Sequence, residues 1–330
     1  MTEGVAYARA GLLGNPSDSY GGKIIAVSVK NYAARVVLEE SESLRFVPSA
    51  EDGESFSSLA DFERHTGRYG YEGGIRLIKA GLKTFLGYAR GRGGGLPDRP
   101  FAVRYASTIP RQVGLGGSSA IIAAAMRAFM AFYRVEIPLE LQPALILDAE
   151  RAELGIVAGF MDRVAQVYEG CVFMDLEPEL FRAKGHGRYE RLDPRLLPPL
   201  YLAYRPENAK VSGRVLSEIR TRFDAGDDHT IRTLRRIADL AGQGRTALLA
   251  GRPGEMAGLM NENFDLRRTI MAIRPADLDM VEAARACGAS AKFAGSGGSV
   301  VGSYRDERMF DNVARALASQ GAVVVKPMIA

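Results

Sequence analysis

Residues 114–120 read GLGGSSA, and they stand directly before IIAAAMRAFMAFY (residues 121–133), whose apolar character predicts a helix. The preceding segment FAVRYAS (101–107) predicts a strand that leads the chain to this turn. So many glycines and serines at a helix start have two interpretations. Serine can cap the helix while glycine makes the turn, or the bare backbone N–H groups can bind a phosphate.

The residues around this loop favour phosphate without deciding the matter. Pro110 and Arg111 stiffen the approach to the loop and place a cation beside it. Ser118 and Ser119 fall at the helix start, where a hydroxyl can cap the helix or reach a magnesium ion held by phosphates. The loop matches neither the P-loop, which needs Gly-Lys-Ser/Thr, nor the dinucleotide fingerprint, whose last glycine is replaced by Ser119.

The composition is typical of a globular protein that has room for one large domain or two. The chain has 330 residues, of which 47% are hydrophobic and 25% charged. Its net charge of +4 is scattered, and Cys171 and Cys287 match no metal-ligand spacing. The start lacks a signal-peptide pattern, and the longest apolar run is too short to span a bilayer. We therefore expect a cytoplasmic protein that binds neither nucleic acid nor membrane.

Strands and helices are mixed along the chain without regular βαβ repetition, which predicts an α+β protein of two lobes. Residues 23–40 alternate and turn at Lys30–Asn31, which predicts a β-hairpin. Prolines interrupt the periodicity around 191–200, so we expect one domain over residues 1–190 and another over 191–330. The other expected elements are helices at 71–89, 118–134, 139–153 and 158–168, a loop at 89–100, strands at 170–176 and 201–206, about four helices up to Cys287, a helix from Arg305 and a strand at 322–327.

A second glycine-rich segment, AKFAGSGGSVV (291–301), lies between two apparent strands. Glycine at such a place indicates either a close approach of the backbone to a ligand or an ordinary hairpin turn. The segment alone does not decide between them.

Asp162 stands among apolar neighbours, where a carboxylate is costly to bury unless it is paired or bound to a metal. It can be a structural partner of Arg163 or Arg151, or it can act as a base or electrostatic partner toward a reacting hydroxyl. Histidine offers no alternative base, since the three histidines lie in polar segments without a recognisable motif (His65, His186 and His229).

Three ordered segments resemble the motifs of the GHMP kinases, the family of galactokinase, homoserine kinase, mevalonate kinase and phosphomevalonate kinase. They are ARAGLLGNPSDSYGG (8–22), similar to the substrate-binding start of galactokinases, PRQVGLGGSSA (110–120), similar to the phosphate loop, and KFAGSGGSVV (292–301), similar to the C-terminal glycine motif. Within the family, the chain resembles the glucuronokinases in segments such as IPRQVGL (109–115), ELGIVAGFMDRVAQVY (153–168) and LMNENFDLRR (259–268). The resemblance implies a two-lobed α+β fold, with a ribosomal-S5-like N-terminal lobe and a ferredoxin-like C-terminal lobe.

The resemblance also implies a role for individual residues. Asp162 and Arg9 match the catalytic aspartate and the residue that orients the reacting hydroxyl. Ser119 and Glu150 match the magnesium ligands, with Ser118 as the alternative hydroxyl because the extra Gly117 leaves the choice open. ATP contacts are implied for Pro110, Gly114, Leu115, Gly116, Gly117, Ser118, Ser119 and Ala120, and substrate contacts for Asp18, Asn15, Ser17, Gly295 and Ser296.

The activity implied is transfer of the γ-phosphate of ATP to the anomeric hydroxyl of D-glucuronate, with Mg²⁺ as cofactor. A substrate carboxylate needs a cationic partner, for which arginine has the matching geometry. Arg111 and Arg163 are the candidates nearest the motifs, and Arg267–Arg268 lie in a further segment that resembles the subfamily. The alternatives are an anomeric kinase for another sugar, such as galacturonate, galactose or a heptose derivative, and a non-catalytic sensor of the same fold. We expect small-molecule partners only, and a monomer or a homodimer.

Overall fold

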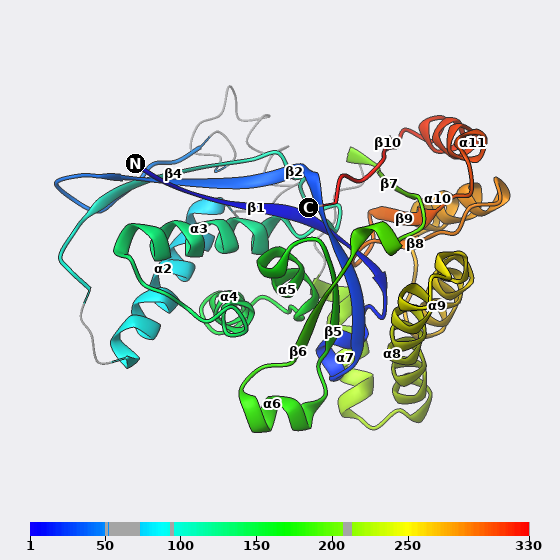
Figure 1. The fold of residues 1–330 in the computed structure, drawn as a ribbon, viewed down its shortest axis with the longest axis horizontal. Coiled ribbons are helices and arrows are strands. Elements are labelled where there is room, and N and C mark those ends of the chain that lie inside the picture. The colour runs from blue at the N-terminus through cyan, green and yellow to red at the C-terminus, as the bar shows by residue number, and fades with distance from the viewer. Residues whose placement is uncertain (50–51, 53–72, 93–95, 207–212, 330) are drawn as a thin grey trace.

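The computed structural model describes residues 1–49, 52, 73–92, 96–206 and 213–329. Within these residues the chain forms a large sheet and a smaller one at the far end of the molecule (Figure 1). The large sheet has the strand order β3-β4-β2-β5-β6, with β1 also paired to β2. Its strands are β1 (Thr2–Leu13), β2 (Lys23–Glu40), β3 (Arg45–Phe46), β4 (Phe101–Ser107), β5 (Cys171–Asp175) and β6 (Arg188–Leu192).

The hairpin predicted at residues 23–40 is wrong, because β2 is one long strand. β1 runs antiparallel along nearly all of β2, while β5 and β4 share the opposite edge, at residues 23–27 and 34–40. Lys30 and Asn31 lie between these two halves, where the register with β1 shifts after Tyr7. The polar pair therefore marks a bulge, which bends a strand without reversing it.

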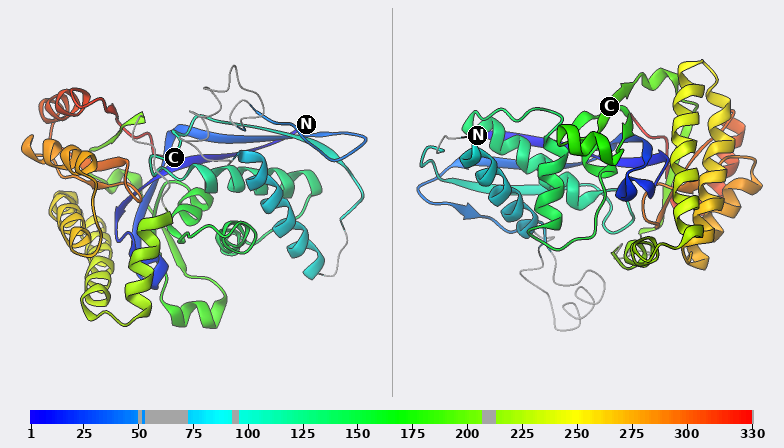
Figure 2. Two further views of the ribbon diagram at one scale, coloured as in Figure 1. Left: turned by 180° about the vertical axis from the view of Figure 1, so that it is seen from behind. Right: turned by 90° about the horizontal axis from the view of Figure 1, so that it is seen from below.

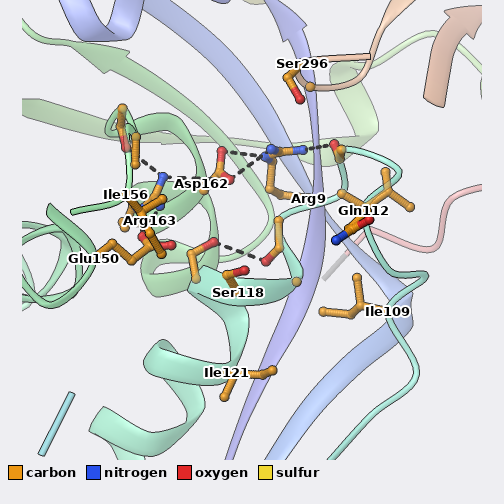
Figure 3. A pocket seen from close by; sticks show the side chains of 18 of the residues that line it. Arg9, Ile109, Gln112, Ser118, Ile121, Glu150, Ile156, Asp162, Arg163 and Ser296 are labelled. Atoms are coloured by element: carbon orange, nitrogen blue, oxygen red, sulfur yellow. Dashed lines mark hydrogen bonds and ion pairs between the residues drawn. The ribbon is translucent and has the colours of Figure 1, made fainter. Parts of the chain in front are cut away.

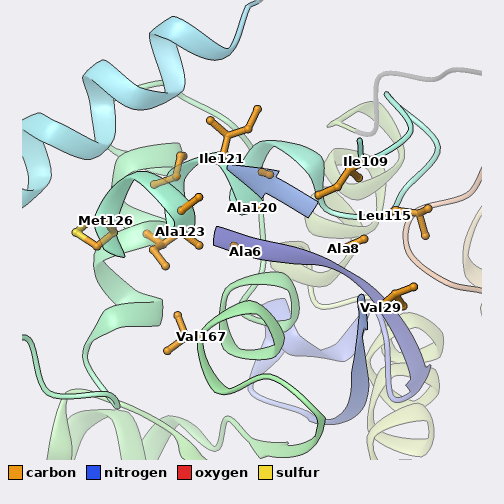
Figure 4. Packing of buried hydrophobic residues seen from close by; sticks show 14 of the residues in the cluster. Ala6, Ala8, Val29, Ile109, Leu115, Ala120, Ile121, Ala123, Met126 and Val167 are labelled. Atoms are coloured by element: carbon orange, nitrogen blue, oxygen red, sulfur yellow. The ribbon is translucent and has the colours of Figure 1, made fainter. Parts of the chain in front are cut away.

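Four helices cover one face of the large sheet, as Figures 1 and 2 show. They are α2 (Gly74–Gly91), α3 (Gly117–Tyr133), α4 (Gln142–Arg151) and α5 (Met161–Tyr168). The short helix α6 (Pro178–Lys184) joins β5 to β6. Small side chains let α3 pack closely on β1: Ala6 and Ala8 of the strand and Ala120 and Ala123 of the helix belong to one buried cluster (Figure 4). This packing fixes the start of α3 against β1.

The smaller sheet has the strand order β10-β7-β9-β8. Its strands are β7 (Leu200–Tyr204), β8 (Lys292–Phe293), β9 (Ser299–Ser303) and β10 (Val323–Val325). The helices of this half are α7 (Gly213–Asp224), α8 (Asp228–Leu249), α9 (Met256–Ile270), α10 (Pro275–Ala286) and α11 (Glu307–Ala318). None of the helices in the described part of the chain has the length and apolarity that a membrane crossing requires.

The chain passes from the large sheet to the small one between Leu192 and Leu200. The two halves are not separately packed, since Leu240 and Leu248 of α8 lie in the same buried cluster as the large sheet. A division at residues 190 and 191 therefore remains a proposal.

Most predicted elements are confirmed, including the strand at 101–107, the helix starting at 117–118 and the four helices between β7 and Cys287. α2 extends to Gly91, into the segment predicted as a loop, while residues 93–95 of that loop lie outside the described ones. The segment 291–301 does form a hairpin, of β8 and β9.

Candidate active site

A cavity of about 480 Å³ lies where the three glycine-rich segments meet (Figure 3). This volume is suited to a small-molecule ligand. Asn15 and Asp18 of the first segment, residues 109–112 and 114–119 of the second, and Gly295 and Ser296 of the third all line it. Folding therefore brings together the three motifs that the sequence analysis singled out.

Arg9 and Asp162, the two residues predicted to be catalytic, form a forked ion pair in this cavity. Arg9 Nε donates to Asp162 Oδ1 at 2.7 Å, and Arg9 Nη2 donates to Asp162 Oδ2 at 2.9 Å. Arg9 belongs to β1 and is 4% exposed, whereas Asp162, in the first turn of α5, keeps 18% of its side chain exposed. The pair thus holds a carboxylate in a fixed orientation while leaving part of it open to the cavity.

The structural partners considered for Asp162 are engaged elsewhere. Arg163 Nη1 lies 3.7 Å from Asp162 Oδ2, farther than the Arg9 nitrogens, and Arg151 donates to the carbonyl of Ala158. Arg9 is therefore the main partner of the Asp162 carboxylate.

The loop before α3 has its carbonyl groups bonded to the protein. Gly114 O accepts from Arg9 Nη1 at 2.5 Å, and Leu115 O accepts from the Arg9 backbone N–H at 3.1 Å. Gly116 O accepts from Gln166 Nε2 at 2.7 Å. Because the first N–H groups of a helix have no acceptor within it, the first turn of α3 keeps donors for an anion at its positive end.

Gly116 holds this loop close to the ion pair. It precedes α3 with a φ of +77°, which favours glycine, and a Cβ there would lie 3.3 Å from Asp162 Oδ2. The predicted proton acceptor therefore lies close to the predicted phosphate seat, with little room for a side chain between them.

The two serines differ in exposure, and neither caps α3 with its side chain. Ser118 is exposed and lines the cavity, while Ser119 is 1% exposed and its hydroxyl donates to Gly116 O at 3.1 Å. Ala120, predicted to contact ATP, does not line the cavity, because it is fully buried and its N–H bonds to Gly116 O. The remaining predicted ATP contacts, Pro110, Gly114, Leu115, Gly116, Gly117, Ser118 and Ser119, all line it.

Glu150, the predicted magnesium ligand, also lines the cavity, and Oε2 of its carboxylate pairs with the Arg163 guanidinium. Both side chains are buried, with 2% of Glu150 and 5% of Arg163 exposed. Arg163 Nη1 also donates to Gly159 O at 2.8 Å. Burial, assisted by the charge of Arg9, lowers the pKa of Arg163 to about 9. A buried pair of this kind orients both groups, and Oε1 of Glu150 takes no part in it.

Asp18 connects the first segment to α5. Its Oδ2 accepts the backbone N–H of Met161, the first residue of that helix, at 3.1 Å. Burial raises the pKa of the Asp18 carboxyl above its ordinary value of 3.8, and repulsion by Asp162 adds to this, while the Met161 hydrogen bond and the Arg163 charge oppose it. Asp18 is therefore a second carboxyl group on the cavity wall, beside Asp162.

Asn15 and Ser17 hold the first segment in place. Asn15 is 2% exposed; its Nδ2 donates to Gly295 O at 3.2 Å, and its Oδ1 accepts from Lys292 Nζ at 2.6 Å. Ser17 does not line the cavity, because it is 1% exposed and its hydroxyl donates to Lys23 O at 3.3 Å. A substrate contact through Ser17 therefore has no support in this arrangement.

The arginines considered for a substrate carboxylate occupy different places. Arg111 and Arg267 line the cavity, together with Arg9, Arg76 and Arg163, whereas Arg268 is exposed and does not. Arg267 is 1% exposed, and its Nη1 donates to Gly295 O at 2.7 Å.

Three supporting residues were not predicted from the sequence. Gln166 holds the phosphate loop, Lys292 donates to Gly11 O, Asn15 Oδ1 and Phe293 O, and Asn263 Oδ1 accepts from the backbone N–H of Gly14. A lysine inside an apolar strand is a weak signal of such a role, and Gln166 and Asn263 give none. Of the histidines, His186 and His229 do not line the cavity, and His65 lies outside the described residues.

The fold and these motifs match a known family. A model of the GHMP kinase N-terminal domain matches residues 76–170, and a model of the GHMP kinase C-terminal domain matches residues 245–323. The chain belongs to the GHMP kinases, and it is a phosphotransferase with an alcohol group as acceptor. Kinases of this family use ATP as a substrate.

Two curated relatives from Arabidopsis thaliana extend over most of the chain. The chain is 46% identical to probable glucuronokinase 2 over 303 residues, which cover 90% of this chain and 82% of the relative. It is 44% identical to glucuronokinase 1 over 302 residues, which cover 90% and 83%. Among solved structures, Streptococcus pneumoniae phosphomevalonate kinase superposes with a TM-score of 0.77 at 15% identity, over all of both chains. That likeness concerns the fold, which confirms the α+β, two-lobed GHMP kinase architecture.

Proposed function

We propose that the chain transfers the γ-phosphate of ATP to the anomeric hydroxyl of D-glucuronate, giving ADP and glucuronate 1-phosphate. The substrate comes from the two glucuronokinase relatives, which are similar over 90% of the chain. The observation that supports the chemistry is the close approach of Gly116, at the start of α3, to Asp162, as expected for a proton acceptor beside a seat for phosphate.

Different residues of the cavity would bind each of the two substrates. The N–H groups at the start of α3 bind the phosphates of ATP, so that the γ-phosphate points toward Asp162. Asp162 accepts the proton of the anomeric hydroxyl as its oxygen bonds to phosphorus and the bond to ADP breaks. Arg9 holds the Asp162 carboxylate and keeps the phosphate loop at a fixed distance through Gly114. Asp18 and Asn15, which line the cavity from the first segment, would contact sugar hydroxyls.

The donors on the cavity wall fit a magnesium ion. Mg²⁺ needs only one or two carboxylates when phosphates supply further oxygens, and Glu150 Oε1 with the hydroxyl of Ser118 or Ser119 would provide protein ligands. The described residues contain no group of three or more His, Cys, Asp and Glu side chains that could hold a metal by themselves, which agrees with an ion shared with a nucleotide. When bound, the ion would neutralise charge on the β- and γ-phosphates.

The test is ADP formation by the purified protein with MgATP and a panel of acceptors: D-glucuronate, D-galacturonate, D-galactose, mevalonate and a heptose phosphate. We expect turnover with D-glucuronate above the others. Turnover with another sugar only would support the kinase activity and reject D-glucuronate as its substrate. If no acceptor is turned over while ATP still binds, the result would favour a non-catalytic sensor with the same fold.

A further inference from the structure

We propose that Arg267 binds the carboxylate of the sugar acid and sets the preference for a uronate over a neutral sugar. This inference rests on the proposed function and deepens it, since the sequence left four arginines as candidates for this contact. It follows from the position of Arg267, from its surroundings and from the pairing of the other cations.

Arg267 is separated by a single residue, Gly295, from Arg9, the arginine that is paired with Asp162. Its Nη1 donates to Gly295 O at 2.7 Å, and a Cβ on the same Gly295 would lie 3.0 Å from Arg9 Nη1. Asn15 shares the Gly295 carbonyl, at 3.2 Å. Arg9 and Arg267 thus both lie beside Gly295. In a uronate ring the anomeric carbon and the carbon that bears the carboxylate are both bonded to the ring oxygen, so the carboxylate lies near the reacting end of the sugar.

Gly295 lies against Gly114, which precedes the start of α3, and its carbonyl also accepts from Asn15 of the first segment. In Figure 3, Ser296 lies on the opposite side of Arg9 from Ser118 and Ile121. Arg111, by contrast, belongs to the segment that leads into the phosphate loop. Because Arg267 shares the Gly295 carbonyl with Asn15, it reaches the part of the cavity lined by the first segment, where the sugar is proposed to bind.

The charges of the other buried cavity arginines are already paired. Arg9 is paired with Asp162, and Arg163 with Glu150. Within the described part of the chain, no carboxylate forms an ion pair with Arg267, whose Nε contacts only Met271 Sδ, at 2.9 Å. Lys292, buried nearby, is likewise held by carbonyl and amide oxygens.

A buried cation without a counterion costs free energy. Burial lowers the pKa of Arg267 to about 10, the charge of Arg9 adds to this, and the charges of Asp18 and Asp277 oppose it. Burial and the charges of Arg267 and Arg9 lower the pKa of Lys292 well below its ordinary value. A substrate carboxylate would give Arg267 a directly paired negative charge, and the planar guanidinium suits it geometrically.

The experiment compares D-glucuronate with D-glucuronamide, which has the same shape without the charge. We expect Arg267→Met to lower kcat/KM for the acid about 100-fold and to change kcat/KM for the amide much less. Arg268→Met is the matched control on the exposed face of the same helix, and it should leave both values unchanged. Arg267→Lys keeps the charge without the fork, so its acid-to-amide preference should fall at least about tenfold.

The outcomes separate this inference from the proposed function. Equal losses on acid and amide in Arg267→Met would make Arg267 a mere support of Gly295 and overturn the assignment. If that variant does not fold, Arg267→Lys decides, and an unchanged acid-to-amide preference overturns the assignment. A wild-type enzyme that phosphorylates the acid without preferring it to the amide also overturns it, while leaving the proposed kinase intact. A wild-type enzyme inactive on every sugar acid overturns both.

Discussion

Arg9 and Asp162, which are 153 residues apart in the sequence, meet in a two-point ion pair that also reaches the phosphate loop through the carbonyl of Gly114. One side chain from β1 therefore fixes the carboxylate and the loop relative to each other. Because this arginine contacts both the proposed proton acceptor and the proposed phosphate seat, we expect the chemistry of the site to depend on both members of the pair.

Asp162→Asn should lower kcat by about 10³, within the range that general base catalysis contributes, and leave the Kd for MgATP within about twofold. The amide keeps the size of the side chain but accepts no proton at neutral pH. Single-turnover rates and ATP titration calorimetry measure the two quantities. Turnover near that of the wild type would remove Asp162 from the mechanism.

Arg9→Lys should lower kcat strongly although it keeps the charge, because lysine cannot contact both Asp162 oxygens and the Gly114 carbonyl with the same fork. In the double variant with Asp162→Asn, the losses should be far from additive, since the two residues act as one unit. Additive losses in this cycle would contradict the coupling.

Gly295→Ala should abolish turnover, because the added Cβ would lie 2.2 Å from Gly114 O and 3.0 Å from Arg9 Nη1. The matched control is Gly258→Ala within α9, where nothing lies within 4 Å of the added Cβ. That substitution should stabilise the protein by about 0.5–1 kcal/mol, the helix-interior difference between alanine and glycine. Melting curves and kcat for both variants test the contrast, and an active Gly295→Ala enzyme would argue against a tight loop contact.

The sequence was sufficient to predict most of the helices and strands and to identify the three motifs. The apolar helix after residue 117 and the strand at 101–107 follow from local patterns, and motif order identified the segments that meet in the cavity. The prediction of a hairpin at Lys30–Asn31 was wrong because a bulge and a turn use the same residue types, and only the pairing with β1 distinguishes them.

The supporting contacts of the site could not be derived in the same way. Whether Arg163 faces a substrate or pairs with a carboxylate depends on how two segments pack together, and the pair with Glu150 was not predicted. The choice among Arg111, Arg163, Arg267 and Arg268 likewise needed burial and counterions, which a linear pattern does not contain.

Glu150→Gln should destabilise the fold by about 3–5 kcal/mol, because it removes the nearest counterion of the buried Arg163 guanidinium. Adding Arg163→Met should recover most of this loss, since the pair is then replaced by groups that need no charge balance. Urea unfolding of the single and double variants measures both values. A double variant no more stable than Glu150→Gln would mean that the pair itself contributes little.

Asp18→Asn should raise the melting temperature at pH 7.5 while it lowers turnover. The folded-state pKa of Asp18 is raised above 3.8 by burial and by Asp162, so ionising this carboxyl costs more in the folded protein than in the unfolded chain. That cost is absent below the unfolded pKa and complete above the folded one. Asparagine avoids it and can still accept the Met161 N–H through its side-chain oxygen.

The gain in melting temperature over the wild type should therefore shrink as the pH falls from 7.5 toward the unfolded value of 3.8, because the Asp18 carboxyl is increasingly protonated in the folded wild type. Turnover should fall at every pH, because the amide replaces a carboxylate acceptor placed for sugar hydroxyls. Calorimetric melting from pH 4 to 8 measures the first effect, and kcat/KM for D-glucuronate measures the second. The opposite result would be a variant that melts below the wild type by the same amount at every pH. It would show that Asp18 stabilises the fold through its hydrogen bond to α5, and would contradict the view that its carboxylate costs stability for the sake of substrate binding.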